Sequence, residues 1–241
     1  MVSNKSDFQS SSFSSNGSSS NGSTIKKTKV KNGNSIIHFD SIEEALKDFA
    51  EGKFVLVVDN EERENEGDLI IAAEKVTAEK MAFMIKYTSG LICVPTPPER
   101  LDQLEIPLMV PNNNTEKLKT AYTISVDYKH GISAHDRALT ARCLANPDIT
   151  NPNDFNRPGH IFPLRYVPGG VLKRIGHTEA SIDLCKLAGL QPVGVICELV
   201  KDDGSMARRD DCRLFADEHD LKLITIDDLI KYRLENGHLE I

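Results

Sequence analysis

The segment from Val57 to Glu74, VVDNEERENEGDLIIAAE, places the strongest constraint on what this chain can fold into. Two apolar runs, Phe54 to Val58 and Leu69 to Ala73, flank its centre and have the length and composition of buried strands. Asn65 and Gly67 supply turn residues between them. The sequence therefore predicts two buried strands joined by a loop crowded with carboxylates. The charged residues of this loop are Asp59, Glu61, Glu62, Arg63, Glu64, Glu66 and Asp68.

Such crowding has a chemical consequence. Carboxylates this close repel one another and raise one another's pKa unless a cation lies among them. A divalent metal is a common cation at such places, and hard cations prefer oxygen ligands. The alternative is an acidic turn surrounded by water. We favour a metal site because the acidic residues directly join two buried strands.

Composition excludes several classes of protein. The net charge is -7, with 29 Lys and Arg against 36 Asp and Glu, so a basic face for nucleic acid is not expected. No apolar run is long enough to span a bilayer, and no signal-peptide core is visible. The odd number of cysteines and the absence of a C-x-x-C pair predict reduced thiols. The cysteines are Cys93, Cys143, Cys185, Cys197 and Cys212. We expect a cytoplasmic protein, with association with mitochondria as the alternative.

The chain divides into a tail and one domain. Residues 1–37 are rich in Ser, Asn and Gly and are predicted to be disordered, because they contain too little apolar surface to offset the entropy of folding. This tail lacks arginine and carries Asp7, which is atypical of a mitochondrial presequence. Residues 38–241 have enough apolar residues for a single core.

Strand and helix patterns alternate along this domain, which predicts a layered α/β (α+β) fold with a mixed sheet flanked by helices. Pro95, Pro97 and Pro98 are expected to end the third strand, and residues 146–158 are expected to be an irregular loop. The predicted strands are 54–58, 69–73, 91–94, 122–126, 160–167, 193–200 and 221–226. The predicted helices begin near Ser41, Thr77, Ser133, Thr178, Asp210 and Asp227.

The segment from Arg174 to Thr178 is a second candidate site. A glycine, a hydroxyl and two basic side chains precede a helix start, where free backbone N–H groups favour anions. Arg174 can bind a phosphate with two hydrogen bonds. The alternative is an ordinary helix cap with an exposed basic residue. His177 is either a metal ligand for the acidic loop or a packed histidine.

Two further residues suit acid–base chemistry. His160 ends the predicted irregular loop within Arg157-Pro158-Gly159-His160, and an imidazole titrates near neutral pH. Glu198 lies within a strongly apolar strand, where a carboxylate is costly unless it is paired. The alternative for Glu198 is a position on the solvent face. Together the candidates describe a pocket for metal-assisted chemistry on a small phosphorylated molecule.

Several motifs in the chain, in the same order, closely resemble the family of 3,4-dihydroxy-2-butanone 4-phosphate synthase, an enzyme of riboflavin biosynthesis. The resemblance extends from about Ile42 to the C-terminus and leaves out the tail. The motifs are DNEERENEGDL (59–69), YTSG (87–90), SAHDR (133–137), NRPGHIFPLR (156–165), GHTEA (176–180) and CEL (197–199).

The resemblance implies a homodimeric lyase that converts D-ribulose 5-phosphate into L-3,4-dihydroxy-2-butanone 4-phosphate and formate with Mg2+, Mn2+ being possible. It implies that Glu64 and His177 bind the metal and that His160 and Glu198 are catalytic. The substrate-binding residues that it implies are Arg63, Glu64, Asp68, Arg174, Ile175, Gly176, His177 and Thr178.

One departure from the family pattern precedes Ile132. Members of the family carry a Gly-Thr-Thr-Thr-Gly type loop there, whereas this chain runs from Asp127-Tyr128-Lys129-His130-Gly131 directly into Ile132-Ser133. The loss removes hydroxyl groups from the substrate site, and a small misplacement near the chemistry lowers rates strongly. Two alternatives therefore stand beside the synthase: a protein of the same fold that binds a metabolite or partner without turnover, and a phosphosugar isomerase that releases no formate.

Overall fold

Seven strands form one mixed sheet in the computed structural model, which describes residues 37–129 and 131–240. The strands are β1 (Val55–Val58), β2 (Gly67–Ala72), β3 (Cys93–Thr96), β4 (Val126–Tyr128), β5 (Phe155–Arg165), β6 (Gly194–Glu198) and β7 (Lys222–Thr225). Their order is β4-β5-β3-β6-β2-β1-β7. The β1–β7 and β3–β5 pairs are parallel, and the remaining pairs are antiparallel. The predicted mixed sheet is confirmed. The predicted disorder of residues 1–37 falls, except for Ile37, outside the described residues.

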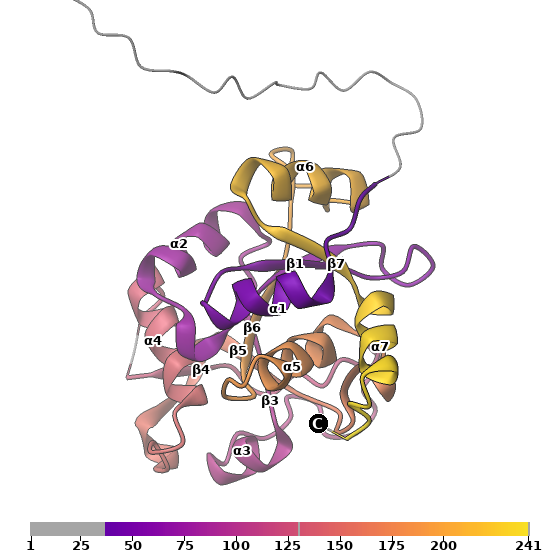
Figure 1. Ribbon diagram of the computed structural model, residues 1–241. Helices are drawn as coiled ribbons and strands as arrows, with labels where there is room; N and C mark the ends of the chain where they lie inside the picture. The colour runs from indigo at the N-terminus through magenta and orange to yellow at the C-terminus, as the bar shows by residue number, and fades with distance from the viewer. Residues whose placement is uncertain (1–36, 130, 241) are drawn as a thin grey trace, which may run out of the picture. The chain divides into compact units, whose positions relative to one another are not determined.

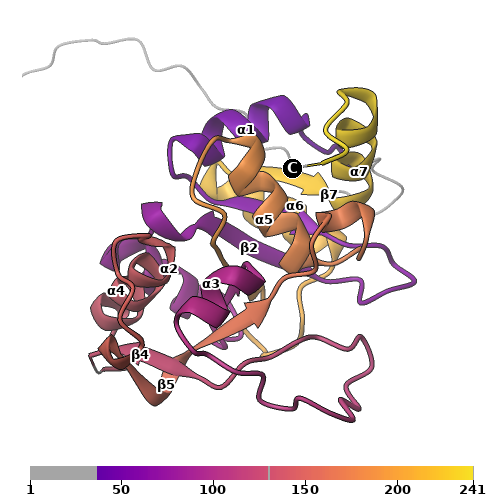
Figure 2. The same cartoon turned by 90° about the horizontal axis from the view of Figure 1, so that it is seen from below.

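Helices cover both faces of this sheet. The α-helices are α1 (Ile42–Ala50), α2 (Ala78–Tyr87), α3 (Pro98–Gln103), α4 (Ala134–Ala145), α5 (His177–Leu187), α6 (Arg209–His219) and α7 (Ile226–Glu235). Short 3-10 helices are η1 (Ala73–Lys75), η2 (Pro152–Asp154) and η3 (Gly170–Leu172). Figure 2 separates α2 and α4 on one side from α1, α5 and α7 on the other. None of the described helices combines the length and the apolarity needed to cross a membrane, and the cytoplasmic location stays a prediction.

Alternate side chains of the central strands point to opposite faces of the sheet, which explains the two layers of helices. Leu56 and Val58 of β1 belong to an apolar cluster with α2, α4 and α6, whereas Val55 and Val57 join a second cluster with α1, α5 and α7. Successive strand residues point to opposite faces, so a strand covered on both faces has no polar alternation. β1 and β2 are accordingly buried along their whole length, as the apolar runs predicted. Figure 1 shows β1 beside β7, its parallel partner.

Helix starts follow the predicted caps. The side-chain oxygens of Ser41, Thr77 and Ser133 accept hydrogen bonds from backbone N–H groups three residues later, at 3.2, 3.3 and 3.1 Å. Each such cap stabilises its helix by about 1 kcal/mol. These three positions show that short polar signals located the helix starts correctly.

Three local predictions were wrong. The strand predicted at 122–126 is displaced, because β4 begins at Val126 and residues before it form only isolated bridges. The predicted loop 146–158 ends early, since β5 already begins at Phe155 and includes Pro158 and Gly159. Pro95 lies inside β3 instead of ending it, and Pro98 opens the unpredicted helix α3. Proline and glycine disfavour strands locally, but pairing with neighbouring strands overrides that preference here.

A buried ion pair fastens the C-terminal helix to the domain. Arg233 of α7 is fully buried and lies 2.7 Å from the carboxylate of Asp183 on α5. The same guanidinium donates to the backbone carbonyls of Gly169, His238 and Leu239. One side chain therefore joins α5, the turn before η3 and the residues that follow α7.

Candidate active site

The acidic loop between β1 and β2 is organised around Asp59. Its Oδ1 accepts from the backbone N–H of Glu66 at 2.9 Å, and its Oδ2 accepts from the N–H of Glu64 at 3.1 Å. Arg63 donates to the same Oδ2 at 2.8 Å and also contacts the carboxylate of Glu64. The loop is therefore closed by its own hydrogen bonds, and the fully solvated turn considered above does not describe it.

His177, the first residue of α5, turns one ring nitrogen toward this loop. Its Nε2 is 3.1 Å from the carbonyl oxygen of Val57, and because a carbonyl only accepts, Nε2 carries the proton. Burial lowers the pKa of His177, so the ring is neutral and Nδ1 presents a lone pair. That nitrogen lies 3.6 Å from Asp68 Oδ1 and 4.0 Å from Glu64 Oε2. A lone pair beside two carboxyl groups is the arrangement of a cation site.

Three carboxyl groups of this region have a raised pKa. Burial, followed by the nearby charges of Glu198 and Glu64, raises the pKa of Asp68 well above its ordinary value. Burial likewise raises the pKa of Glu64 and of Glu66. Asp68 Oδ1 is buried and has no hydrogen-bond partner among the described residues. Burial is the largest cause for all three residues, and the neighbouring charges that the sequence suggested as the cause come after it.

A divalent cation fits this donor set. One ligand atom each from Asp59, Glu64 and His177 lie within 4.8 Å of one another. Both oxygens of Asp59 are already engaged in the loop, whereas the free oxygen of Asp68 faces His177. Carboxylate oxygens with one imidazole suit a hard or borderline cation. Glu64 and His177 were the predicted ligands, and Asp59 is an addition.

The start of α5 forms the cationic part of the site. Arg174 donates to the carboxylate of the buried Glu179 at 2.6 Å. A Cβ atom at Gly176 would lie 2.6 Å from Arg174 Nη1 and 3.2 Å from Arg63 Nη2, so both guanidinium groups converge over this glycine. Two guanidinium groups next to a helix N-terminus favour an anion such as phosphate.

Glu198 faces the acidic loop from the end of β6. It is the cross-strand partner of Asp68, so both side chains leave the sheet on the same face. Ser89 Oγ donates to Glu198 Oε2 at 2.7 Å. The apolar strand suggested that Glu198 is buried. In the structure its side chain is only half-buried, because β6 ends at Glu198, beside the pocket.

One pocket brings most predicted site residues together. Ile175, Gly176 and His160 do not line it, and Ile175 is largely exposed. Its lining consists of Arg63, Glu64, Asp68, Cys93, Thr120, Tyr122, Leu164, Arg174, His177, Thr178, Ile196 and Glu198.

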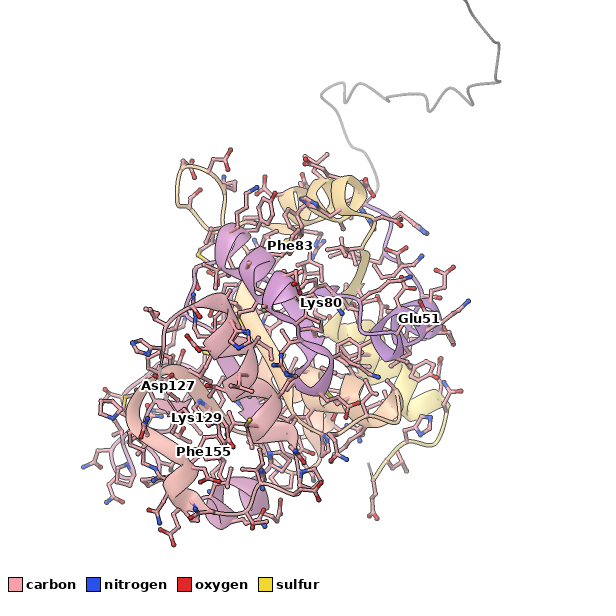
Figure 3. All side chains as sticks on the ribbon, turned by 90° about the vertical axis from the view of Figure 1, so that its left-hand side faces the viewer. Glu51, Lys80, Phe83, Asp127, Lys129 and Phe155 are labelled. Carbon is pink, nitrogen blue, oxygen red and sulfur yellow. The ribbon has the colours of Figure 1, made fainter. Side chains whose placement is uncertain are left out.

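His160 lies on β5, outside this pocket, and pairs closely with Asp127 of β4. Its Nδ1 is 2.6 Å from Asp127 Oδ2, and its backbone N–H donates to Asp127 Oδ1 at 2.8 Å. A register shift beside Val126 accompanies this pairing. Gly159 allows the strands to approach, since a Cβ there would lie 2.0 Å from the Val126 carbonyl carbon. Asp127 is buried at this edge of the sheet, near the labelled Lys129 in Figure 3, while the His160 side chain is 45% exposed.

Sequence reasoning missed several residues of these two regions. Asp59 was noted only as part of the acidic loop, although its position directly after a buried strand is a signal for a structural carboxylate. Asp127 ends the alternating run Thr123 to Asp127, and a carboxylate in such a run could have been flagged as paired. Thr120 and Tyr122 enter the pocket from a loop, and no local pattern indicates them.

Comparisons with known proteins agree with one another. The family model described as 3,4-dihydroxy-2-butanone 4-phosphate synthase matches residues 43–232. A protein of that name from Schizosaccharomyces pombe is 60% identical over 197 residues, which cover 80% of this chain and 96% of the relative. A crystal structure described as 3,4-dihydroxy-2-butanone 4-phosphate synthase in complex with two magnesium ions aligns with a TM-score of 0.78 at 49% identity, covering 84% of this chain and 100% of that one. The chain spans only 43% of a longer relative, the Arabidopsis thaliana protein RIBA 2 of riboflavin biosynthesis, at 58% identity over 206 residues, which are 83% of this chain.

Proposed function

The chain belongs to the 3,4-dihydroxy-2-butanone 4-phosphate synthase family of riboflavin biosynthesis, and on that premise we propose that it is a lyase that converts D-ribulose 5-phosphate into L-3,4-dihydroxy-2-butanone 4-phosphate and formate with Mg2+ or Mn2+. One observation carries the proposal: a single pocket brings the neutral His177 and the Glu64 carboxyl group together with the guanidinium groups of Arg63 and Arg174. A small sugar phosphate has complementary groups, hydroxyls for a cation held by Glu64 and His177 and a phosphate for the guanidinium groups.

Glu64 and His177 would hold the divalent cation, with Asp59 or Asp68 as the further oxygen donor. A bound cation supplies positive charge that stabilises the negative charge developing on substrate oxygens. Arg63 neutralises part of the acidic loop and Arg174 holds the phosphate, so the substrate is fixed at both ends. Fixing both ends aligns the reacting carbons with the catalytic side chains.

Glu198 is suited to accept a proton in this pocket. Ser89 donates to its Oε2, which leaves Oε1 available for the substrate. Asp68 opposite, with its raised pKa, holds a proton more readily than an ordinary carboxyl group and can donate a hydrogen bond to a substrate oxygen. Two carboxyl groups on neighbouring strands, one of them with a raised pKa, suit the proton transfers in the rearrangement of a ketose through an enediol.

His160 requires a different explanation, because it does not line the pocket of its own chain. We propose that the protein is a homodimer in which His160 of one copy reaches the pocket of the other. Asp127 accepts from Nδ1–H and leaves Nε2 free to exchange a proton, and the exposed side chain is available for such a contact. The dimer would complete each active site with an acid–base group that one chain does not place there.

The test is formate release from D-ribulose 5-phosphate by the purified full chain, with Mg2+ and then with chelator. We expect formate only with the cation, and a loss of at least about a thousandfold in the Glu64→Ala variant, because the pocket then lacks a ligand. Glu62→Ala removes an equal charge from an exposed position of the same loop and should retain activity. Formate release by Glu64→Ala equal to that of Glu62→Ala would contradict the assignment.

A second function is favoured by the short turn after β4. Only residues 129–132 separate β4 from Ser133, the cap of α4, where the family pattern carries a threonine-rich loop. A protein that binds the sugar phosphate and the cation but releases no formate would fit this feature. Conversion to another five-carbon phosphosugar without formate would instead identify an isomerase.

A further inference from the structure

Arg208, the residue before α6, makes an unusual set of contacts with the acidic loop. Its Nη1 donates to the backbone carbonyl of Glu64 at 2.7 Å and to that of Asn65 at 2.6 Å. The carboxylate of Glu66 lies 3.7 Å from the same nitrogen. One guanidinium group therefore holds three consecutive residues of the loop, two of them through the main chain.

The backbone of the loop is shaped for this contact. Asn65 has a φ of 54°, in the left-handed region, so the carbonyls on either side of it converge on one donor. Glu64 thus has its main chain bound to Arg208 while its carboxylate lies 4.0 Å from His177 Nδ1. Asp59 and Arg63 also hold Glu64, through its N–H and its carboxylate, so loss of the Arg208 contact would loosen the placement of the carboxylate beside the histidine.

The backbone around Arg208 is itself held in place by contacts with the residue that follows β6 and with α6. The N–H of Ala207 donates to the carbonyl of Leu199 just after β6, and the N–H of Arg208 donates to the carboxylate of Asp211 at 2.9 Å. Cys212 of α6 is buried against Gly67, where a Cβ atom would lie 2.4 Å from its sulfur. Arg208 therefore projects from a fixed helix start onto a loop whose exit is pressed against the same helix.

We propose that Arg208 is a positioning residue that holds the acidic loop in its cation-binding conformation and thereby sets the affinity for the divalent cation. The inference rests on the proposed function, because it takes Glu64 and His177 as the ligands. Groups that orient metal ligands commonly contribute ten- to a hundredfold in metal affinity. The ion pair with Glu66 alone would contribute little, since an exposed pair adds almost nothing.

The adjacent Arg209 provides a matched control. It has the same charge but pairs through its side chain with Glu61, whose side chain is 62% exposed, at 3.1 Å. Arg208→Ala and Arg209→Ala therefore remove equal charge within one residue of each other, and only the first releases loop carbonyls. Arg208→Lys keeps the charge but loses the planar donor that reaches both carbonyls.

The experiment measures Mn2+ binding to the full chain by calorimetry, together with hydrogen exchange of the amides of residues 60–67. In Arg208→Ala we expect the Kd to rise about ten- to a hundredfold and the loop amides to exchange faster at an unchanged melting temperature. Arg209→Ala should stay within about twofold of the original Kd. Arg208→Lys should fall between them, and it tests the proposal by itself if Arg208→Ala does not fold.

Equal Kd values and equal loop exchange in the Arg208 and Arg209 variants would overturn the proposal, as would a full chain that binds no Mn2+. Formate assays separate this result from the proposed function. A chain that makes no formate, but loses Mn2+ binding only in the Arg208 variants, contradicts the synthase and supports the positioning role. If the chain makes formate and both alanine variants have unchanged Kd values, the synthase function is supported and the positioning role of Arg208 is contradicted.

Discussion

The acidic pocket and the His160–Asp127 pair are built in opposite ways. The pocket gathers side chains from β2, β3, β5, β6, α5 and three loops, and it contains a buried Asp68 oxygen with no partner among the described residues together with carboxyl groups of raised pKa. The pair lies on two adjacent strands, and both carboxylate oxygens of Asp127 are bonded to His160. The first region leaves this Asp68 oxygen without a partner among the described residues, and a bound ligand could supply one. In the second region both oxygens of Asp127 already have partners, and only a substrate would have to be added.

This difference separates binding from proton transfer within one chain. The residues that we propose for cation and phosphate recognition are assembled by one copy of the protein. The imidazole that we propose for catalysis is presented at a separate edge of the sheet. Changes in the two regions should therefore produce different kinds of defect, and three predictions test this expectation.

The largest effect is expected from Asp127→Asn. An amide cannot supply the negative charge beside Nδ1 and can turn its NH2 group toward the ring, so His160 is held in the wrong tautomer. We expect kcat to fall about a hundred- to a thousandfold with Mn2+ affinity unchanged. Steady-state formate assays and calorimetry measure the two quantities. Asp148→Asn, on an exposed loop, is the control, and equal kcat values for both variants would show that the pair has no catalytic role.

An intermediate effect is expected when His160→Ala and Glu198→Ala chains are mixed. Each variant alone should be inactive. If His160 acts on the pocket of its partner, half of the randomly paired dimers carry one intact site, and about a quarter of the original formate rate should return. Denaturation and joint refolding of equal amounts, followed by the formate assay, makes the measurement. An inactive mixture that contains verified mixed dimers would place both groups in the site of a single chain.

The smallest effect is expected on stability. In the folded chain the pKa of Asp68 lies well above its ordinary value of 3.8, so the native state binds this proton more tightly than the unfolded state does. The free energy of unfolding therefore decreases as the pH rises from the unfolded pKa toward the folded one. In cation-free buffer, Asp68→Asn should be more stable at pH 7 by about 1 to 2 kcal/mol. The difference in the free energy of unfolding between the two proteins should narrow as the pH falls to about 3, below the unfolded pKa, where the carboxyl group is largely protonated in both states.

Urea unfolding of both proteins across this pH range measures the difference between their free energies of unfolding. Asp148→Asn again serves as the control, because its carboxylate is exposed and its loss should leave the pH dependence unchanged. A wild-type chain that is more stable than Asp68→Asn at pH 7 without a cation would show that the buried carboxylate has a partner. The buried carboxylate of the pocket would then have a partner within the protein, as Asp127 has in His160.

The sequence predicted the layered fold and the pocket because both leave local signals. Apolar runs located β1, β2 and β6, and cap residues located the starts of α1, α2 and α4. Glu64 and Asp68 were found because charge directly beside a buried strand is costly unless it has a purpose. Arg174 was singled out because a helix start favours anions, and His177 because the acidic loop lacked a cation.

The remaining features depend on contacts between distant segments. Pro158 and Gly159 are breakers by local preference, yet they lie inside β5, which pairs with β4. Arg208 follows the acidic loop by more than a hundred residues, and its role appears only when α6 packs against Gly67. No spacing rule connects such positions, because the connection is made by tertiary packing.

The buried pair of Arg233 and Asp183 also affects how the domain comes apart. If α7 detached alone, the carboxylate of Asp183 would remain buried without its partner, at a cost of about 3 to 5 kcal/mol. Fraying of the C-terminal helix is therefore penalised far more than at a typical chain end. Native-state hydrogen exchange in α7 should follow global unfolding, and proteases should find no early cleavage point there. The last helix belongs to the cooperative unit that holds Gly169 and the turn leading to Arg174.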